Sequence, residues 1–326
     1  MKAIVMSSFG DPEVLQIKEI NEPIPGVNEV RVRLHAAGVN PNEAYIRSGN
    51  YSFGVPDLPF TPGFDGAGVV DAVGEGVTHV KVGDRVFVAA MLAKKNTGTY
   101  AQKVVCEADA VHLLADNVSF EQGASLGIPA MAAYRALFHR AKLKASEVVL
   151  IHGASGGVGT LAVQMAKAIG AVVIGTASSD EGKAMVKDAG ADFATDHLRE
   201  DNFDEILKIT DGKGPDVIIE FLANHNLEND MKIISQYGRI VIVGNRGSIE
   251  ITPRHAMGKE ADILGMALWN APPKEYKESL YGISAFLKSG VVVPIVGDKF
   301  KLEEAYKTHE LILTKKGHGK MVLLID

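Results

Sequence analysis

The spacing of apolar residues divides the chain into regions with different periods. Over roughly the first 120 residues, apolar and polar positions alternate in short runs, as in Val-Arg-Val-Arg-Leu at Val30–Leu34, which is typical of a half-buried strand. Nine prolines and glycines lie between Pro56 and Gly83. Because such residues mark turns between short strands, we expect a compact, barrel-like β unit here.

A different pattern begins at Ser119. Ser119-Phe-Glu-Gln122 fits a capping box, and a helical stretch follows to about Ala141, interrupted by Pro129. From Glu147, short apolar strands alternate with helical segments. The predicted strands are Val148–His152, Val172–Thr176, Val217–Phe221, Ile240–Val243 and Ile263–Met266, and the predicted helices are Val158–Ile169 and Glu181–Ala189. This alternation predicts an α/β fold with a doubly wound parallel sheet.

The C-terminal residues do not continue the alternation. They predict helices at Lys274–Ser289 and Leu302–Leu313 and a closing strand at Lys320–Ile325. We therefore expect the doubly wound domain, residues 123–266, to be inserted into a β domain formed by residues 1–122 and 267–326.

Composition narrows the class of protein. The chain has 326 residues, enough for two domains, and its hydrophobic content of 46% and charged content of 23% are those of a globular protein. A net charge of −6 gives no sign of a basic surface for nucleic acid or membrane. Cys106 is the only cysteine, which excludes a disulfide framework and favours a reducing compartment. With neither a secretory signal nor an apolar run of about 18 residues, we expect a soluble, cytoplasmic protein.

The strand predicted at Val148–His152 leads directly into Gly153-Ala-Ser-Gly-Gly-Val-Gly159. Ala154, Gly156 and Gly159 match the spacing G-x-G-x-x-G, with alanine in the first position. In such a turn the second glycine lets the backbone approach a pyrophosphate, and the third lets the helix pack closely on the strand. The helix N-terminus then favours the phosphate charge. A strand before the turn and a helix after it predict a dinucleotide-binding site.

The same turn permits a different function. Gly153-Ala-Ser155-Gly-Gly157 also fits G-x-S-x-G, the nucleophile elbow of α/β-hydrolases, which requires a downstream acid and histidine. Candidates for these are Asp216, Glu220, His255 and His309. The elbow usually follows several strand–helix units, whereas this turn opens the series, and Gly159 has no role in an elbow. We favour the dinucleotide site; a glycine-rich turn without a ligand is the third interpretation.

The end of the second strand indicates which dinucleotide is bound. NAD-specific sites usually carry an acid there, which binds the ribose 2′-hydroxyl. In this chain the strand ends at Ser178, and no acid occurs before Asp180. Ser178 and Ser179 stand where a carboxylate would repel a 2′-phosphate, and Lys183 follows within one helical turn. These residues could also simply cap and solvate the next helix, but the pattern favours NADPH.

Four segments resemble a known superfamily. They are Gly38-Val-Asn-Pro-Asn-Glu-Ala-Tyr-Ile-Arg-Ser-Gly-Asn-Tyr51, Pro62-Gly-Phe-Asp-Gly-Ala-Gly-Val-Val70, Ile219-Glu-Phe-Leu-Ala-Asn224 and Val243-Gly-Asn-Arg-Gly-Ser-Ile-Glu-Ile251. Over nearly its full length the chain resembles the medium-chain dehydrogenase/reductase superfamily, and within it the zinc-free quinone oxidoreductase branch of the ζ-crystallin type. The resemblance implies a Rossmann domain inserted in a GroES-like β-barrel catalytic domain, and a homodimer or homotetramer.

Zinc-using relatives place a cysteine after a Gly-Val pair and a His-Glu pair in a later block. Here those positions hold Asn40, Phe64 and Asp65, and Asn and Phe cannot complete a zinc shell. The histidines elsewhere in the chain show no metal-ligand spacing, so no metal site is expected. Without a Lewis acid, an acceptor that is already electrophilic is favoured over an alcohol. We therefore expect NADPH-dependent reduction of a quinone or enone, by hydride or single-electron transfer.

The resemblance also implies roles for individual residues. Asn40 and Tyr45 would line the cleft near the nicotinamide, and Tyr51 matches a tyrosine that related enoyl-thioester reductases use as a proton donor. The expected pyrophosphate contacts are Ser155, Gly156, Gly157 and Val158. The expected 2′-phosphate contacts are Ser178, Lys183 and His197, with Lys320 as a further candidate. The expected contacts of the nicotinamide half are Asn226, Val243, Gly244, Asn245 and Arg246. From the residues alone, Tyr45 could equally be a packing aromatic and His197 a solvated side chain.

A non-enzymatic function stays open at this point. Proteins that resemble ζ-crystallin can serve as lens structural proteins or bind AU-rich RNA. The acidic charge balance and the lack of an arginine-rich or RNA-recognition motif favour a small-molecule enzyme instead.

Overall fold

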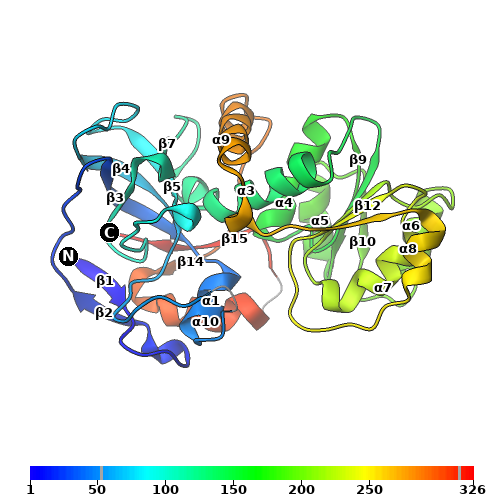
Figure 1. Cartoon of the computed structure of the whole chain (residues 1–326), viewed down its shortest axis with the longest axis horizontal. Helices are drawn as coiled ribbons and strands as arrows, with labels where there is room; N and C mark the ends of the chain where they lie inside the picture. The colour runs from blue at the N-terminus through cyan, green and yellow to red at the C-terminus, as the bar shows by residue number, and fades with distance from the viewer. Residues whose placement is uncertain (52–53, 315–316) are drawn as a thin grey trace. The chain divides into compact units, whose positions relative to one another are not determined.

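The computed structural model describes residues 1–51, 54–314 and 317–326, and it divides into two compact units (Figure 1). Unit 1 comprises Met1–Pro129 and Pro294–Asp326, and unit 2 comprises Ala130–Val293. Unit 2 ends at Val293, well beyond residue 266, where the doubly wound domain was predicted to end. The reason is helix α9 (Pro273–Lys288), which packs within unit 2: Arg135 Nε donates to Glu275 Oε2 at 3.0 Å.

Unit 1 is built on a mostly antiparallel sheet centred on β3 (Glu29–Gly38). The strand order is β14-β15-β3-β4-β5-β7, and β6 also pairs with β3. The other strands are β4 (Asp65–Val73), β5 (Arg85–Ala89), β6 (Lys103–Glu107), β7 (Val111–Leu113), β14 (Val296–Lys301) and β15 (Lys320–Leu324), with β1 (Lys2–Val5) and β2 (Gln16–Glu19) forming a separate pair. Val30, Val32 and Leu34 are buried, which confirms the predicted strand.

Three helices of unit 1 are α1 (Pro41–Arg47), α2 (Phe120–Ala124) and α10 (Ala305–Thr314). The capping box at Ser119 is confirmed, because Ser119 Oγ accepts from Gln122 N at 3.2 Å and Gln122 Oε1 accepts from Ser119 N at 2.9 Å. The helical stretch predicted after it is broken into α2, α3 (Gly127–Tyr134) and a π-helix at Arg135–Arg140. The break precedes Pro129, which lies in the first turn of α3, where proline is tolerated.

Unit 2 is a six-stranded parallel sheet in the order β10-β9-β8-β11-β12-β13. Its strands are β8 (Val148–Ile151), β9 (Val172–Ala177), β10 (Phe193–Asp196), β11 (Val217–Glu220), β12 (Arg239–Ile242) and β13 (Asp262–Gly265). The helices between them are α4 (Gly157–Ala168), α5 (Asp180–Asp188), α6 (Asn202–Ile209), α7 (Ala223–Ile233) and α8 (Pro253–Lys259). All five predicted strands are present, which confirms the doubly wound sheet.

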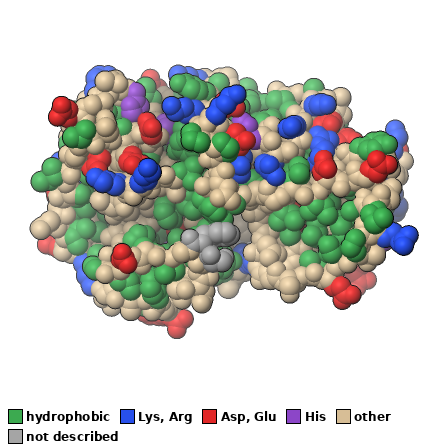
Figure 2. Space-filling view, in the orientation of Figure 1, with side chains coloured by type: hydrophobic (Ala, Val, Ile, Leu, Met, Phe, Trp, Pro, Cys, Tyr) green, Lys and Arg blue, Asp and Glu red, His purple; other side chains and the backbone are tan. Residues whose placement is uncertain are grey.

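The surface has mixed charge. On the face drawn in Figure 2, lysine and arginine side chains are interspersed with aspartate and glutamate. Among the described residues, no helix combines the length and the apolar character needed to cross a membrane.

Candidate functional site

The glycine turn of unit 2 joins the end of β8 to the start of α4. Gly153 has a φ of +53°, and its N–H donates to Thr176 Oγ1 at 3.1 Å, while Ala154 N donates to Thr176 O at 2.8 Å. A Cβ at Gly159 would lie 2.6 Å from both Ala154 Cα and Gly153 O. Only glycine fits at Gly159, so the turn brings the N-terminus of α4 tightly onto the strand end.

Strand order places this turn where ligands bind in such sheets. The chain runs outward from β8 through β9 to β10, then returns to β11 on the other side of β8. The connections after β8 and β11 therefore run in opposite directions, and in open α/β sheets ligands bind at the carboxyl ends of the strands where the order reverses in this way. Ser155, Gly156, Gly157 and Val158 lie in the turn and first residues of α4, at this edge of the sheet. The free N–H groups of a helix N-terminus favour a phosphate there.

The predicted 2′-phosphate residues come together at the ends of β9 and β10. Ser178 directly follows β9, and Lys183 lies in α5, whose N-cap Ser179 accepts from Gly182 N at 3.1 Å. His197 follows β10, and its Nδ1 is 3.1 Å from Thr176 Oγ1. Lys183 Nζ pairs with Asp180 at 2.9 Å on the surface. Because exposed pairs contribute little, a dianionic phosphate can compete for this ammonium.

Arg199 is a cation near this group that sequence analysis did not single out. A hydrogen bond from Lys183 to Asp180 raises the pKa of Lys183, and the charge of Arg199 opposes that rise. Arg199 itself binds Asp201 through two hydrogen bonds of 2.8 and 2.6 Å. Arg199 lies in the turn after β10, and only the pairing of β10 with β9 brings that turn near Lys183, so the sequence alone does not single it out.

The residues predicted for the nicotinamide half lie in two neighbouring loops. Val243 N and Gly244 N both donate to Glu220 O, and Arg246 N donates to Asn224 Oδ1 at 2.9 Å. A Cβ at Gly244 would lie 2.3 Å from Phe221 O, so glycine is required where the loops touch. Asn245 is exposed and its Nδ2 donates to Gly247 O, whereas Asn226 is half-buried in α7.

The residues considered for a hydrolase have other partners. Asp216 accepts from Val148 N at 2.8 Å. It therefore lies at the start of β8, whereas Ser155 follows the other end of that strand. His255 pairs with Glu228 at 3.3 Å, and His309 lies in unit 1 beside Tyr100. Glu220 accepts from Leu222 N. These contacts do not assemble a nucleophile, acid and histidine, so they favour the dinucleotide interpretation.

Unit 1 holds the predicted catalytic residue Asn40 in a buried polar cluster. Asn40 precedes α1, and Glu43 accepts from its N at 2.9 Å and from its Nδ2 at 3.1 Å. Asn40 Nδ2 also donates to Asp65 Oδ2 at 3.0 Å. Lys320 Nζ donates to Asn40 Oδ1 and lies 3.8 Å from Asp65 Oδ2. Tyr100 donates its hydroxyl proton to Glu43 Oε2 at 2.7 Å.

Burial and charge set the protonation of this cluster. Burial raises the pKa of Glu43 to about 7, although Lys320 opposes the rise. Burial also raises the pKa of Asp65, against the charge of Lys320. Burial lowers the pKa of Lys320, against the charges of Asp65 and Glu43. One ammonium therefore faces two buried carboxyl groups, and burial favours the protonated form of each.

Lys320 is not supported as a contact of the 2′-phosphate. Its ammonium is buried in this cluster and bound to Asn40, because β15 runs beside β3: Val39 N donates to Met321 O at 3.0 Å. Glu43 and Tyr100 are the cluster members for which sequence analysis assigned no role, while Asp65 was considered only as a former zinc position and His309 only as a hydrolase histidine. They lie far apart in the chain, and only the pairing of β3, β4 and β15 brings the charged members together.

The two tyrosines predicted for catalysis lie on α1 and the segment that follows it. Tyr45 is half-buried, and its backbone oxygen accepts from Asn50 N at 3.1 Å. Burial raises the pKa of Tyr51, and a hydrogen bond with Asn42 opposes the rise. Tyr51 therefore stays protonated at neutral pH, as a proton donor must.

Comparisons with known proteins agree with this architecture. Residues 26–116 match the family model described as the alcohol dehydrogenase GroES-like domain, and residues 157–284 match the zinc-binding dehydrogenase model. The quinone oxidoreductase of Rattus norvegicus is 45% identical, over 100% of this chain and 98% of its own. The chain belongs to the quinone oxidoreductase branch of the medium-chain dehydrogenase/reductase superfamily.

Solved structures of this superfamily share the fold across the whole chain. The Escherichia coli quinone oxidoreductase complexed with NADPH is 31% identical, with a TM-score of 0.88 over 99% of this chain and 100% of that one. An NAD-dependent alcohol dehydrogenase, also 31% identical, has a TM-score of 0.91 over 100% of both chains. The GroES-like and Rossmann domains expected from the resemblance are thus confirmed, and the chain is an oxidoreductase.

Proposed function

We propose that this oxidoreductase uses NADPH to reduce quinones or α,β-unsaturated carbonyl compounds, without a catalytic zinc. The observation that carries the proposal is the acid-free end of β9, where Ser178, Lys183 and His197 gather beside a glycine turn built for a pyrophosphate. When bound, NADPH would supply the hydride. The chain's own part is to hold the phosphates and to exclude water from the reacting groups.

Zinc-free chemistry is supported by the donor set. Of the three positions that would carry zinc ligands, Asn40 offers a neutral amide that is already bonded to Glu43, Asp65 and Lys320. The side chain of Phe64 has no atom that can bind a metal, and the backbone N–H of Phe64 donates a hydrogen bond to Glu43 Oε1 at 3.3 Å. The ammonium of Lys320 places a positive charge in this cluster, which repels a second cation. A quinone or enone needs no such cation, because it is already electrophilic.

We also propose that Tyr51 supplies the final proton and that Tyr45 contacts the acceptor. Asn40 was expected to contact it too, but its side chain is buried and hydrogen-bonded to Glu43, Asp65 and Lys320, which does not support a direct contact. Pyrophosphate contacts are assigned to Ser155, Gly156, Gly157 and Val158, and nicotinamide contacts to Asn226, Val243, Gly244, Asn245 and Arg246. The homodimer or homotetramer, the cytoplasmic location and the absence of nucleic-acid binding stay predictions.

Binding and turnover together test the proposed function. Calorimetric titration with NADPH and NADH gives the cofactor preference, and turnover with a quinone and an enone gives the acceptor class. Failure to bind NADPH would sink the cofactor assignment. Tight binding with no turnover of either acceptor would favour a cofactor-binding structural protein. Turnover that vanishes after dialysis against a chelator and returns with Zn²⁺ would contradict the zinc-free mechanism.

Lys183→Ala should weaken NADPH binding about tenfold and leave NADH binding within about twofold, because Lys183 meets only the 2′-phosphate. Calorimetry with both cofactors measures the two affinities. Lys187→Ala is the matched control, since Lys187 lies on the same helix and its Nζ donates to Asp192 O at 2.6 Å. Equal losses for NADPH and NADH in Lys183→Ala would show that Lys183 does not contact the 2′-phosphate.

A further inference from the structure

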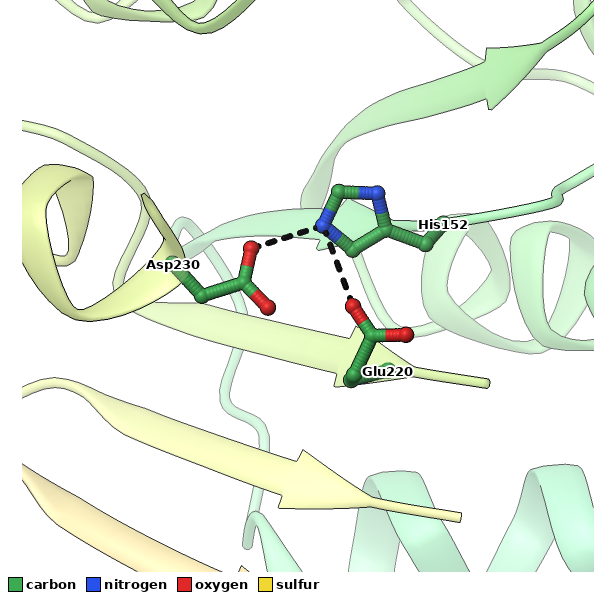
Figure 3. A group of neighbouring side chains, drawn as sticks. All are labelled: His152, Glu220 and Asp230. Atoms are coloured by element: carbon green, nitrogen blue, oxygen red, sulfur yellow. Dashed lines mark hydrogen bonds and ion pairs between the residues drawn. The ribbon is translucent and has the colours of Figure 1, made fainter. Parts of the chain in front are cut away.

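Three ionisable side chains meet inside unit 2, at the carboxyl ends of β8 and β11 (Figure 3). His152 is the last residue before the glycine turn, Glu220 ends β11, and Asp230 lies in α7. His152 Nε2 is 2.8 Å from Asp230 Oδ1 and 3.5 Å from Glu220 Oε2. Glu220 and Asp230 are fully buried, and His152 is 3% exposed. The sequence offered no signal for this group, because its members come from three separate elements.

Two oxygens in this group lack a hydrogen-bond donor. Among the described residues, Glu220 Oε2 and Asp230 Oδ2 have no hydrogen-bond partner, and both are buried. A buried acceptor without a donor is costly, and two facing carboxylates also repel each other. One proton between the two carboxyl groups removes both costs: Glu220 then donates to Asp230, and Asp230 also accepts from His152. Glu220 Oε1 meanwhile accepts from Leu222 N.

We propose that Glu220 is a positioning residue, whose protonated carboxyl donates to Asp230 and so fixes the ends of β8 and β11 where NADPH binds. The backbone supports this role. His152 N donates to Ile219 O at 3.1 Å, which ties the glycine turn to β11. Glu220 O accepts from Val243 N and Gly244 N, which ties the same residue to the nicotinamide loop. The proton thus holds two cofactor-binding loops together.

A bound cation is the main alternative occupant. Ligand atoms of His152, Glu220 and Asp230 lie within 4.8 Å of one another. However, the 2.8 Å between His152 Nε2 and Asp230 Oδ1 is a hydrogen-bond distance. Two ligand atoms bound tetrahedrally to one metal at about 2.1 Å lie about 3.4 Å apart, so the observed contact favours a proton.

Electrostatics agree with a protonated Glu220. Burial first, and then Asp230 through its charge and a hydrogen bond, raise the pKa of Glu220 to about 7, against the opposing charge of His152. The pKa of His152 is raised to about 9 because Asp230 and Glu220 outweigh its burial. Among the described residues, the charged groups acting on Glu220 are His152, which follows β8, and Asp230 from α7. Phe203 from α6 carries no charge, and its ring lies 6.3 Å from that of His152 in a tilted arrangement.

The direction of the pH dependence follows from these shifts. A carboxyl whose pKa is higher in the folded state stabilises that state at low pH. The contribution of Glu220 is complete below its ordinary pKa near 4.5 and is lost as pH rises through about 7. The contribution of His152 is complete below about 6.5 and is lost through about 9. The group as a whole should therefore loosen between neutral and alkaline pH.

A direct test needs no cofactor. Protein labelled with ¹³C at glutamate carboxyls is titrated by NMR, and the resonance missing from E220Q identifies Glu220. A midpoint near pH 7 supports the proposal, and a midpoint below about pH 5 overturns it, because an ordinary glutamate titrates there. Adding Zn²⁺ or Mn²⁺ to the same sample tests whether a cation binds between the three side chains. Stoichiometric loss or shift of the Glu220 resonance would also overturn the proposal that a proton holds the group together.

The effect on cofactor binding rests on the proposed function and is measured separately. E220Q keeps the acceptor for Leu222 and donates an amide N–H to Asp230 at every pH. We expect its NADPH dissociation constant to stay within about twofold of wild type at pH 6. Between pH 6 and 8.5 the wild-type constant should rise about fivefold relative to E220Q, because ionised Glu220 repels Asp230 and adds negative charge near the phosphates.

Comparison with E220Q cancels the titration of the 2′-phosphate itself, whose pKa is near 6. E220M has no donor and should bind NADPH about tenfold more weakly at pH 6, with kcat at saturating NADPH within about twofold of wild type. Glu260→Gln is the exposed control and should change nothing. Identical pH profiles for E220Q and wild type, or full affinity in E220M, would refute the positioning role. Absence of NADPH binding in wild type would instead refute the proposed function, and the NMR result would still stand.

Discussion

Replacing Gly159 by valine should abolish NADPH binding and destabilise unit 2 by about 3 kcal/mol. Even the first carbon of the new side chain would lie 2.6 Å from Ala154 Cα and Gly153 O, which are backbone atoms that cannot rotate away. The N-terminus of α4 must therefore move off the end of β8. Since that movement displaces every N–H group that would face the pyrophosphate, we expect the NADPH affinity to fall more than about a hundredfold.

Two glycine variants separate packing from ligand contact. A Cβ at Gly156 meets only Gly153 O, at 3.4 Å, so Gly156→Ala should fold normally and weaken NADPH binding by blocking its close approach. Gly258→Ala, where a Cβ meets nothing within 4 Å, should change neither property. Chemical denaturation and calorimetry measure the two effects. If Gly159→Val unfolds at the same denaturant concentration as wild type, the close packing of turn and helix is not what requires glycine.

The doubly wound unit could be predicted because its information is local. Each strand of unit 2 is a short apolar run, and the glycine turn combines strand, turn and helix signals within a dozen residues. Even the preference for NADPH depends on a single strand end. The short strand β10 was missed because Thr195 and Asp196 make half of it polar, and its pairing with β9 is decided by the sheet.

The buried groups could not be predicted because their information is in the pairing of distant segments. Lys320 was assigned to a phosphate by resemblance, yet the pairing of β15 with β3 places its ammonium on Asn40. Glu220 looked like a hydrolase acid for the same reason, since a lone acid at a strand end has no partner until the fold supplies one. Segment 267–293 was assigned to the β domain by its position after β13, whereas α9 packs on the π-helix region of unit 2.

Lys320→Met should destabilise unit 1 by about 3–5 kcal/mol at pH 7, because it leaves Asp65 buried without its counter-charge. The hydrogen bonds that Asp65 accepts from Asn40 Nδ2 and Ile128 N remain, at 3.0 and 2.9 Å, but they cannot neutralise its charge. Methionine fills a similar volume, so the loss reports the charge and not a cavity. Equilibrium denaturation of the full chain measures it, with Lys299→Met as the control, because Lys299 is exposed and pairs with Glu121 at 3.3 Å.

The pH dependence distinguishes a lost charge from lost packing. Burial already raises the pKa values of Asp65 and Glu43, and removing Lys320, which lowers both, raises them further. Groups with raised pKa values stabilise the folded state at low pH, so the difference between Lys320→Met and wild type should shrink toward pH 5 and grow toward pH 8. A difference that is constant between pH 5 and 8 would mean that the ammonium does not compensate these carboxylates. The position of the Lys320 ammonium beside Asn40 and Asp65 would then need another explanation.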